Sequence, residues 1–315
     1  MSKLNFNNVN FKNEAEFEES VTKLLLDNGW KNRSFGELNI DNELNNVTEY
    51  DLKLNWLRIL NYNNVDKLDG KSITEKELDL LINEIESKQN VAQVNSDIIP
   101  NQGLQLKREQ KIIPLTLIHK EQLNNDGGKN YFQIARQVRI NNSNNFQKRS
   151  DIFLLINGIP FIHIELKDAD KNIVNAKNQL TNYNKNIYNG IFKFIHIVVA
   201  MNPLKMEYSP RNRELKFINW YDETNKNEIN NWVDVVKNFL SIPMALELIC
   251  DYTIPDGNEL KILRSYQYYA VKKILDKIKK TDLFAAENDK VLLKEVSFDV
   301  QQVQERPLLV LKLVH

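Results

Sequence analysis

The chain has 315 residues, of which 42% are apolar and 27% are charged, and its formal net charge at pH 7 is zero. This length and composition suit a globular protein with one large domain, or one domain and an extension. A neutral chain lacks the global field that draws a protein to nucleic acid or to a membrane, so contact with DNA requires a local basic patch or a partner. The single Cys250 excludes an internal disulfide and fits a reducing compartment. Because the N-terminus has no apolar core and no apolar run approaches the ~20 residues that span a bilayer, we expect a cytoplasmic protein.

The first predicted element is a helix over residues 13–29, NEAEFEESVTKLLLDNG. Asn13 can cap its start and Gly29 can end it. Glu14 and Glu18 are four residues apart and therefore share one face of the helix. By spacing alone, they indicate a solvated helix start that compensates the helix dipole. The apolar stripe of this helix comprises Phe17, Val21, Leu24 and Leu25.

The middle of the chain predicts alternating helices and strands. The predicted segments are an exposed helical region over residues 75–96, strands over 111–119 and 131–140 with a turn between them, and an amphipathic helix over 171–188. The apolar runs DIFLLI and PFIHIELK flank Asn157-Gly158, which is a strong hairpin signal, and KFIHIVVAMN predicts another buried strand. Near-continuous apolar strands require a sheet that is covered on both faces. The order of these elements predicts an α/β fold with a mixed β-sheet flanked by helices.

The last third of the chain predicts helices on either side of a linker. Residues 225–249 predict a helix, TIPDGNEL predicts a linker, and ILRSYQYYAVKKILDKIKK predicts the start of a further helix. The expected inward-facing side chains of the first of these helices are Trp232, Val235, Val236, Phe239 and Leu240.

Three charged residues interrupt the apolar hairpin. Pairing the strands about Asn157-Gly158 sets Ile156 opposite Ile159, and counting outward then sets Asp151 opposite Ile164 and next to Glu165. Because side chains alternate along a strand, Glu165 and Lys167 share one face. We therefore expect Asp151, Glu165 and Lys167 at one end of a two-stranded ribbon.

The chemistry of this trio narrows its function. Two neighbouring carboxylates on a half-buried sheet repel each other, and a divalent cation resolves that conflict. An oxygen-only set of two acids, a backbone carbonyl and water suits Mg²⁺ or Mn²⁺. Such a metal can hold a phosphate oxygen and lower the pKa of a bound water, and a nearby lysine can orient that water or neutralise charge on the phosphate. The alternative is a surface hairpin with an ordinary ion pair, which the apolar surroundings disfavour because buried charges need partners.

The stretch RSDIFLLINGIPFIHIELK, together with QLTNY downstream, resembles the nuclease domain of the R (restriction) subunit of type I restriction–modification enzymes. These domains belong to the PD-(D/E)xK superfamily, so the resemblance implies a restriction-endonuclease-like fold. It also implies that Asp151 and Glu165 are metal ligands and that Lys167 is the catalytic lysine. Gln179 and Tyr183 would then support the site or contact the DNA backbone.

The resemblance extends to both sides of this stretch. The family's first helix carries a glutamate near the site, which favours Glu18 as a further metal ligand and leaves Glu14 as the alternate. Lys148 and Arg149 flank Asp151, and they either meet DNA phosphates or form a solvated strand end.

The histidines carry weaker indications. His163 shares a strand face with Glu165, so it is either a packed core residue or a substrate contact. The remaining histidines, His119, His196 and His315, are scattered and show no zinc-binding spacing.

The segment RSYQYYA resembles the stretch that precedes the ATPase motor of these subunits, in which Gln267 would read adenine. However, the 315 residues contain no G-x-x-x-x-G-K-[ST] motif, which would hold the phosphates of ATP. The resemblance therefore implies ATP for the family, whereas we expect Gln267 to be vestigial and ATP not to bind here.

The C-terminal segment suggests why the motif is missing. In a shifted reading frame, degenerate codons for residues 301–312 can encode Thr-Thr-Gly-Ser-Gly-Lys-Thr, which is a phosphate-binding loop. We hypothesise that a frameshift just before Glu295 truncated an R-subunit gene, and the DNA sequence of this segment tests that hypothesis. The expected organisation is a nuclease domain over residues 1–255, a linker and truncated motor over 256–294, and a non-native tail over 295–315.

The resemblance implies a type I site-specific deoxyribonuclease that hydrolyses double-stranded DNA with Mg²⁺ or Mn²⁺. Its expected partners are DNA and the methyltransferase (M) and specificity (S) subunits, with no membrane. Two alternatives stay open. The chain could be a non-catalytic fragment that docks on the M and S subunits, or another PD-(D/E)xK nuclease that acts in repair or on Holliday junctions.

Overall fold

The computed structural model describes residues 11–31, 41–98, 103–108, 111–119, 129–141, 147–169 and 171–280. The chain up to Tyr269 forms one compact unit, and residues from Ala270 belong to a second, of which the turns of the last helix up to Lys280 are described. The predicted tail over residues 295–315 lies outside the described residues. Within the described ranges, no helix is both long and apolar enough to cross a membrane.

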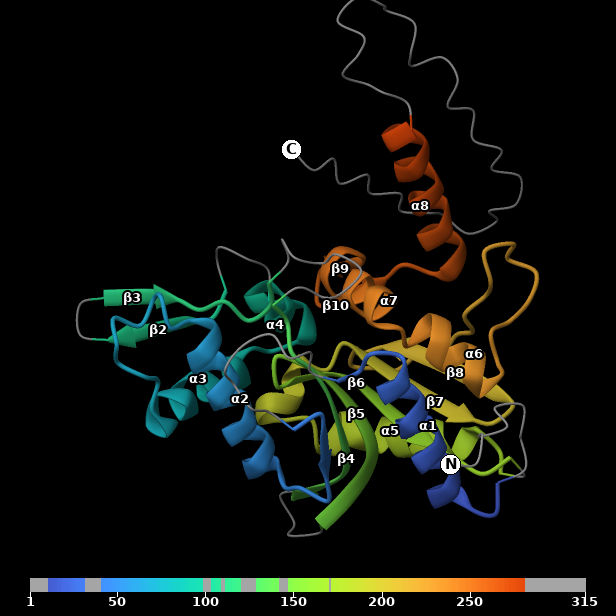
Figure 1. Ribbon diagram of the computed structural model, residues 1–315, viewed down its shortest axis with the longest axis horizontal. Coiled ribbons are helices and arrows are strands. Elements are labelled where there is room, and N and C mark those ends of the chain that lie inside the picture. The colour runs from blue at the N-terminus through green and yellow to red at the C-terminus, as the bar shows by residue number, and fades with distance from the viewer. Residues whose placement is uncertain are drawn as a thin grey trace, which may run out of the picture. The chain divides into compact units, whose positions relative to one another are not determined.

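A mixed sheet forms the centre of the first unit (Figure 1). Within the described residues it has six strands in the order β1-β4-β5-β6-β7-β8. Their bounds are β1 Glu43–Asn45, β4 Phe132–Asn141, β5 Gln147–Ile156, β6 Ile159–Leu166, β7 Ile197–Asn202 and β8 Lys205–Pro210. The pairs β1–β4 and β6–β7 are parallel, and the other neighbours are antiparallel. Every residue of β6 and β7 is buried, so the predicted α/β fold with a mixed sheet covered on both faces is confirmed.

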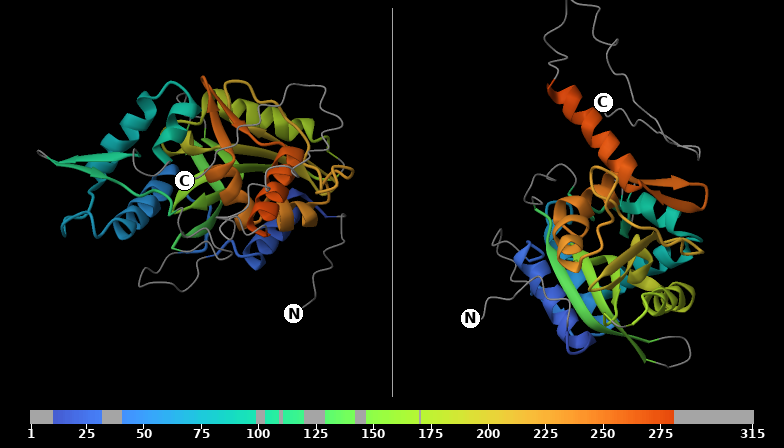
Figure 2. Two further views of the ribbon diagram at one scale, coloured as in Figure 1. Left: turned by 90° about the horizontal axis from the view of Figure 1, so that it is seen from above. Right: turned by 90° about the vertical axis from the view of Figure 1, so that its right-hand side faces the viewer.

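Helices cover both faces of this sheet. The helices α1 (Glu14–Asp27) and α2 (Glu49–Asn63) lie on one side, and α5 (Val174–Asn186) lies on the other (Figure 2). The start of α1 is as predicted, because the Asn13 side chain accepts a hydrogen bond from the Glu16 backbone N–H. The predicted apolar stripe of α1 is buried: Phe17, Val21, Leu24 and Leu25.

The predicted helical region over residues 75–96 is two helices, α3 (Glu75–Ser87) and α4 (Val91–Ile98). Lys88 ends the first because its backbone is extended. Helix α2 was not predicted, although its apolar residues recur at helical spacing and are buried: Leu52, Trp56, Ile59 and Leu60.

Outside the central sheet, the described residues form two small hairpins. In the first, β2 (Gln105–Arg108) pairs with β3 (Lys111–Pro114), so the predicted strand over residues 111–119 is shorter and belongs to this hairpin. In the second, β9 (Thr253–Asp256) pairs with β10 (Glu259–Ile262), and the predicted linker TIPDGNEL is therefore wrong. The turn consists of Gly257 and Asn258, and Gly257 has φ +59°, which suits a two-residue hairpin turn.

The last part of the chain is helical but irregular. The predicted helix over residues 225–249 begins only at Trp232, as α6 (Trp232–Asp234), a π-helical turn (Val235–Phe239), α7 (Ile242–Leu246) and a second π-helical turn (Glu247–Asp251). Its expected inward side chains are buried: Trp232, Val235, Val236, Phe239 and Leu240. Helix α8 (Ser265–Lys280) follows, as predicted.

The β5–β6 hairpin closes through the predicted turn. Asn157 and Gly158 have φ values of +53° and +81°, which suit the tight turn that this dipeptide favours. A side chain at Gly158 would place its Cβ 2.9 Å from the Cα of Trp56 in α2. Glycine at this position therefore permits both the turn and the close approach of the helix.

A β-bulge corrects the predicted register of this hairpin. Ile156 pairs with Ile159 as predicted, and Leu155 pairs with Pro160, but Leu154 pairs with Ile162. Beyond this shift, Asp151 falls opposite Glu165 instead of Ile164, so the predicted register is wrong by one residue. Because side chains alternate along a strand, a slip of one residue exchanges the two faces. The bulge therefore turns Glu165 to the same face as Asp151.

Candidate active site

The predicted trio meets where β5 begins and β6 ends. Asp151 lies in β5, Glu165 lies in β6, and Lys167 follows the last residue of β6. The Leu166 backbone N–H donates a 2.8 Å hydrogen bond to Asp151 Oδ2, which holds the two strands together at this point. The side chains are almost inaccessible, since Asp151 is 8% exposed, Glu165 0% and Lys167 9%.

Glu165 has one oxygen occupied and one oxygen available. Its Oε1 lies 2.9 Å from His163 Nε2. Its Oε2 is buried without a well-formed hydrogen bond to any part of the chain that the structure describes. Burial raises the pKa of Glu165 to about 8, although Lys167 and Asp151 oppose the shift. A buried polar atom without a partner is costly, so Oε2 marks a position for a ligand.

The neighbouring carboxyl groups of Asp151 and Glu18 also have raised pKa values, so each is stabilised by a proton or by a nearby cation. Burial raises the pKa of Asp151 well above its usual range, and the charge of Glu165 adds to the effect. Burial raises the pKa of Glu18 to about 7, and Asp151 adds to it, while Gln137 and Arg136 act in the opposite direction. Carboxyl groups that repel one another in a poorly solvated place are stabilised by a bound cation.

Helix α1 brings both predicted glutamates to the site. Glu14 Oε1 lies 3.0 Å from the Lys167 ammonium, which also donates a 2.6 Å hydrogen bond to the Leu166 carbonyl oxygen. Glu18 lies one turn further along the helix, where the charge of Asp151 helps to raise the pKa of Glu18. The alternate, Glu14, thus contacts the lysine, whereas the favoured Glu18 feels the charge of Asp151 but is bonded to Gln137.

Gln137 is a site residue that the sequence did not indicate. It lies in β4 with φ +53°, in the left-handed region that non-glycine residues rarely adopt. Its side-chain Nε2 donates a hydrogen bond to Glu18 Oε2, and Arg136 Nη1 lies 3.8 Å from Glu18 Oε1. Backbone strain of this kind is concentrated at functional sites. No sequence pattern distinguishes a glutamine in this conformation from any other strand residue.

His163 is packed in the core and also contacts the site. Its Nδ1 lies 2.5 Å from the hydroxyl of Tyr188, and its Nε2 faces Glu165. Burial lowers the pKa of His163 to about 3 and raises that of Tyr188, so the imidazole is neutral and the phenol is protonated. The neutral ring thus bridges the Tyr188 hydroxyl and Glu165 Oε1 through its two nitrogens, one of which donates and the other of which accepts, according to its tautomer. Tyr188 could not be assigned from the sequence, because only the tertiary structure brings it to His163.

The predicted supporting residues lie along α5. The Tyr183 hydroxyl donates a 2.8 Å hydrogen bond to the Arg149 carbonyl oxygen, and Gln179 hydrogen-bonds to the Tyr183 side chain. Lys148 Nζ lies 2.8 Å from Asn182 Oδ1 and 5.5 Å from the centre of the Tyr183 ring. These contacts fasten α5 to the start of β5, next to Asp151.

The oxygen atoms at the site suit a hard divalent cation. The candidate ligands are Asp151, Glu165 Oε2 and the Leu166 carbonyl, with Glu18 beside them. In the described part of the chain, no group of three or more His, Cys, Asp or Glu side chains is already arranged around one metal position. Glu18 is held by Gln137 instead of turning to the pair, and Lys167 occupies the Leu166 carbonyl. A cation would therefore rely on two acidic side chains, a carbonyl and water.

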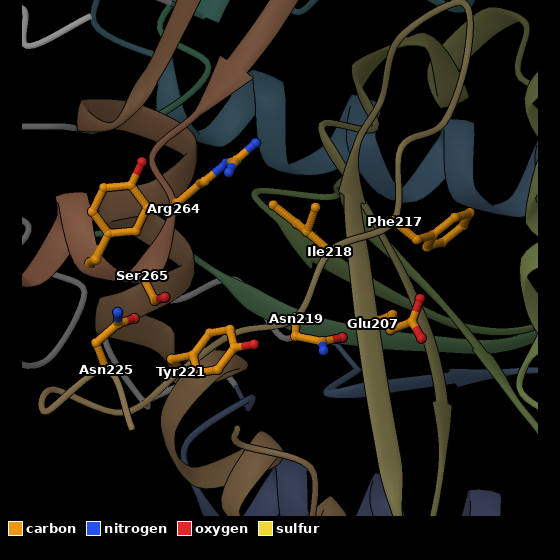
Figure 3. A pocket seen from close by; sticks show the side chains of 9 residues that line it. Glu207, Phe217, Ile218, Asn219, Tyr221, Asn225, Arg264 and Ser265 are labelled. Carbon is orange, nitrogen blue, oxygen red and sulfur yellow. The ribbon is translucent and has the colours of Figure 1, made fainter. Parts of the chain in front are cut away.

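The residue predicted to read adenine lies elsewhere. Gln267 belongs to the first turn of α8, and its Oε1 accepts a hydrogen bond from the Arg264 backbone N–H. A pocket of about 660 Å³ lies at this helix start, where Arg264 and Ser265 face the segment from Phe217 to Tyr221 across an open space (Figure 3). Gln267 is not among the residues that line it.

Comparison with known proteins adds independent information. Residues 11–217 match the family model described as the N terminus of the type I restriction enzyme R protein. This chain belongs to that family. The expected resemblance to R subunits is therefore confirmed, and the matched region contains the whole carboxylate site.

Individual members of the R-protein family show the same relationship. A type I restriction enzyme endonuclease subunit of Staphylococcus aureus (strain COL) is 30% identical over 235 residues, which are 72% of this chain and 24% of the relative. The subunit of Staphylococcus saprophyticus is 28% identical over 280 residues, covering 86% and 28%. The EcoprrI subunit of Escherichia coli is 29% identical over 161 residues, covering 48% and 50%. The chain thus spans about a quarter of the length of the staphylococcal relatives.

Proposed function

We propose that this chain is an Mg²⁺-dependent endonuclease that hydrolyses double-stranded DNA at Asp151, Glu165 and Lys167. The observation that carries the proposal is the buried Asp151–Glu165 pair, with Glu165 Oε2 unbonded and the Lys167 ammonium beside it. The family membership supports it, because the relatives are named endonuclease subunits.

In this proposal Asp151, Glu165 and the Leu166 carbonyl would hold the cation, with Glu18 as a further candidate ligand. When bound, the cation supplies a Lewis acid for a phosphate oxygen and lowers the pKa of water. Mn²⁺ prefers the same oxygen ligands and can replace Mg²⁺.

Lys167 is the group that acts on the reacting atoms. Its ammonium stabilises the charge that develops on the phosphate oxygens and orients the attacking water. The bond from the water oxygen to phosphorus forms while the bond from phosphorus to the 3′ oxygen breaks. The products are a 5′-phosphate and a 3′-hydroxyl that has taken up a proton. Glu14, 3.0 Å from Lys167, holds the ammonium in position.

His163 and Tyr188 are positioning residues in this scheme. The hydrogen bond between His163 Nε2 and Glu165 Oε1 fixes that oxygen, which leaves Oε2 for the cation. A histidine whose other nitrogen is held by a partner keeps one tautomer and one ring orientation. Gln179 and Tyr183 position α5 against the start of β5, where Lys148 and Arg149 can approach the DNA phosphates.

The proposed partners follow from the family. They are duplex DNA and the M and S subunits, which would select the target. Since the 315 residues contain no phosphate-binding loop, we propose that this chain does not itself bind ATP.

Calorimetric titration of Mn²⁺ tests the site directly. The wild-type chain should bind Mn²⁺, and Glu165→Ala and Glu165→Gln should both lose that binding. Glu84→Ala, on the exposed face of α3, is the matched control and should bind like the wild type. Plasmid cleavage with Mg²⁺, with and without M and S subunits, then tests the activity.

The other outcomes select among the alternatives. If the wild type binds no Mn²⁺ with or without duplex DNA, the site is not catalytic and a fragment that docks on the M and S subunits explains the chain better. If the chain cleaves branched DNA without partners and leaves plasmids intact, a nuclease that acts on DNA junctions explains the chain better.

A further inference from the structure

A second, separate cavity lies at the opposite end of the sheet from the carboxylates. It has a volume of about 870 Å³ and lies among the α3–α4 connection, the end of α5, the end of β8 and the β9–β10 turn. Ile162, early in β6, pairs with Ile197, the first residue of β7, which in turn pairs with Pro210, the last residue of β8. The cavity therefore adjoins the start of β6, whereas Glu165 lies near its end.

The lining of this cavity carries more positive than negative side chains. The basic residues are Lys88, Lys185, Lys193, Arg211 and Arg213, and the acidic ones are Glu214 and Glu259. Lys261 Nζ lies 2.5 Å from Glu259, so one of the two acids is already paired. The remaining charge makes the interior of the cavity electropositive.

Arg211 is buried in the wall without a bonded counter-ion. It is 7% exposed, and its guanidinium donates hydrogen bonds to neutral acceptors: Phe192 O at 3.1 Å, Lys193 O at 2.8 Å, Tyr188 O at 3.3 Å and Asn184 Oδ1 at 3.3 Å. No carboxylate in the described part of the chain bonds to it. Burial lowers the pKa of Arg211 to about 10, which leaves the group charged at neutral pH. Buried charges are normally paired, whereas Arg211 is supported by these neutral acceptors and by the Tyr188 ring 5.0 Å away, so an anion would supply the counter-charge that the wall lacks.

Lys193 adds a second positive charge close to Arg211. Its ammonium donates hydrogen bonds to the carbonyl oxygens of Glu86, at 2.5 Å, and Lys88, at 3.0 Å. Burial lowers the pKa of Lys193, the charge of Arg211 lowers it further, and the Glu86 carboxylate opposes the shift. That carboxylate is itself bonded, since its Oε1 accepts a hydrogen bond from the Gly190 backbone N–H. Two neighbouring cations of this kind repel each other, and an anion between them would relieve the repulsion.

The rim and walls of the cavity are already arranged. Lys185 and Arg213 are exposed, and neither forms an ion pair within the described ranges, so both are available to a ligand. Asn212 fastens the β9–β10 hairpin to the end of β8 through hydrogen bonds with the Leu260 backbone at 2.7 and 2.9 Å. Asn90 bonds to Asn258 at 2.9 Å on the other wall. The cavity needs little rearrangement to receive a ligand, which favours binding.

We propose that this cavity binds an oligophosphate, either a free polyphosphate chain or the phosphate backbone of a nucleic acid. Arg and Lys side chains are the usual partners of phosphate oxygens. A volume of about 870 Å³ is within the range of about 300–1,000 Å³ that accommodates a ligand much larger than a single phosphate ion. Lys185, Arg213 and Lys193 contact the anion, and Arg211 contributes its charge from the wall. This site goes beyond the proposed nuclease function and does not depend on it.

Calorimetric titration of tripolyphosphate into the full chain tests this site. EDTA is present throughout, so that no metal at the carboxylates can hold phosphate. The double variant Lys185→Gln/Arg213→Gln removes two exposed rim charges that form no ion pair within the described ranges. Its affinity should fall by about tenfold to a hundredfold. The matched control, Lys76→Gln/Lys226→Gln, removes two exposed lysines outside the cavity and should bind like the wild type.

A short DNA duplex distinguishes the two sources of phosphate. If the duplex displaces tripolyphosphate and its own binding weakens in the rim variant, the ligand is a nucleic-acid backbone. If tripolyphosphate binds and the duplex does not displace it, the ligand is a free oligophosphate. The proposal is overturned if the wild type binds no tripolyphosphate, or if the rim and control variants lose affinity equally.

Discussion

The two ends of β6 bury charges of opposite sign. At one end, Asp151 and Glu165 face each other with one oxygen unbonded, and burial raises the pKa of both. At the other end, Arg211 and Lys193 share a cavity wall, and burial lowers the pKa of both. In each place poor solvation by water disfavours the charged form, and keeping that form there costs stability in the free chain. Charged groups that are poorly solvated in the ligand-free chain therefore mark the places where a ligand of opposite charge is expected.

A line of contacts joins these two ends through the core. The Arg211 guanidinium lies 5.0 Å from the centre of the Tyr188 ring, and the Tyr188 hydroxyl lies 2.5 Å from His163 Nδ1. His163 Nε2 then reaches Glu165 Oε1. The two ends therefore differ in how their charges are supported, since neutral backbone carbonyls hold Arg211 and a neutral imidazole holds Glu165.

The largest expected effect is on the lysine of the carboxylate end. Lys167→Met should lower the DNA cleavage rate by about 10²- to 10³-fold, because one preorganised donor to the developing charge is lost. Mn²⁺ affinity should be retained, since Lys167 is a competitor for the Leu166 carbonyl and not a ligand. Lys111→Met, whose partner Asp69 lies with it at the surface in contact with none of the site residues, is the control for loss of a positive charge. Equal cleavage by both variants would remove Lys167 from the mechanism.

A smaller effect is expected when the support of Glu165 is removed. His163→Leu should weaken Mn²⁺ binding by about 10- to 100-fold, the usual range for a residue that orients a metal ligand. His163→Gln should recover part of this affinity, because its amide can still donate to the carboxylate.

His196→Leu provides the matched control for this comparison. His196 is equally buried, but it bonds to Phe194 O and Asn95 Oδ1, far from the carboxylates in the hydrogen-bond network. Both histidine variants should lose stability, and only the His163 variant should lose metal affinity. If calorimetry shows the same affinity in both, His163 has only a packing role.

The dependence of stability on pH should show the strain at the carboxylate end. The pKa of Glu165 rises from 4.5 to about 8 on folding, so the folded chain binds more protons than the unfolded chain between these values. Stability should therefore fall as pH rises from about 5 to about 8, by on the order of 4 kcal/mol at about 1.4 kcal/mol per pKa unit. Urea unfolding without divalent ions measures this slope, which Glu165→Gln should flatten and saturating Mn²⁺ should offset. Identical pH profiles for the wild type and Glu165→Gln would contradict the assignment, and Glu84→Gln controls for the lost charge.

The smallest expected effect concerns the strained glutamine. Gln137→Gly and Gln137→Ala both remove the hydrogen bond to Glu18, but glycine adopts φ +53° without strain. The glycine variant should be more stable than the alanine variant by about 1 kcal/mol. Both should alter Mn²⁺ affinity equally, because both release Glu18. A larger change in affinity for one of them would show that the backbone, and not the side chain, sets the position of Glu18.

The sequence predicted the parts of the fold that depend on local patterns. The start of α1 at Asn13, the turn at Asn157-Gly158 and the burial of β6 and β7 all follow from capping, turn and hydrophobicity rules. The β9–β10 hairpin was missed even though its Gly257-Asn258 turn is a local signal, because short strands with mixed polarity resemble a linker.

What the sequence determined by itself is the set of reactive groups and their approximate place: Asp151, Glu165 and Lys167 at one end of an apolar hairpin. The tertiary structure decided how they meet. A one-residue bulge turned Glu165 toward Asp151, α1 brought Glu14 and Glu18, and β4 contributed Gln137. Chain-distant contacts such as His163 with Tyr188, and Arg211 with the backbone of residues 188–193, leave no periodic trace in a sequence. They exist because strands and helices that are far apart along the chain pack into one core, where each buried polar atom must find its own partner.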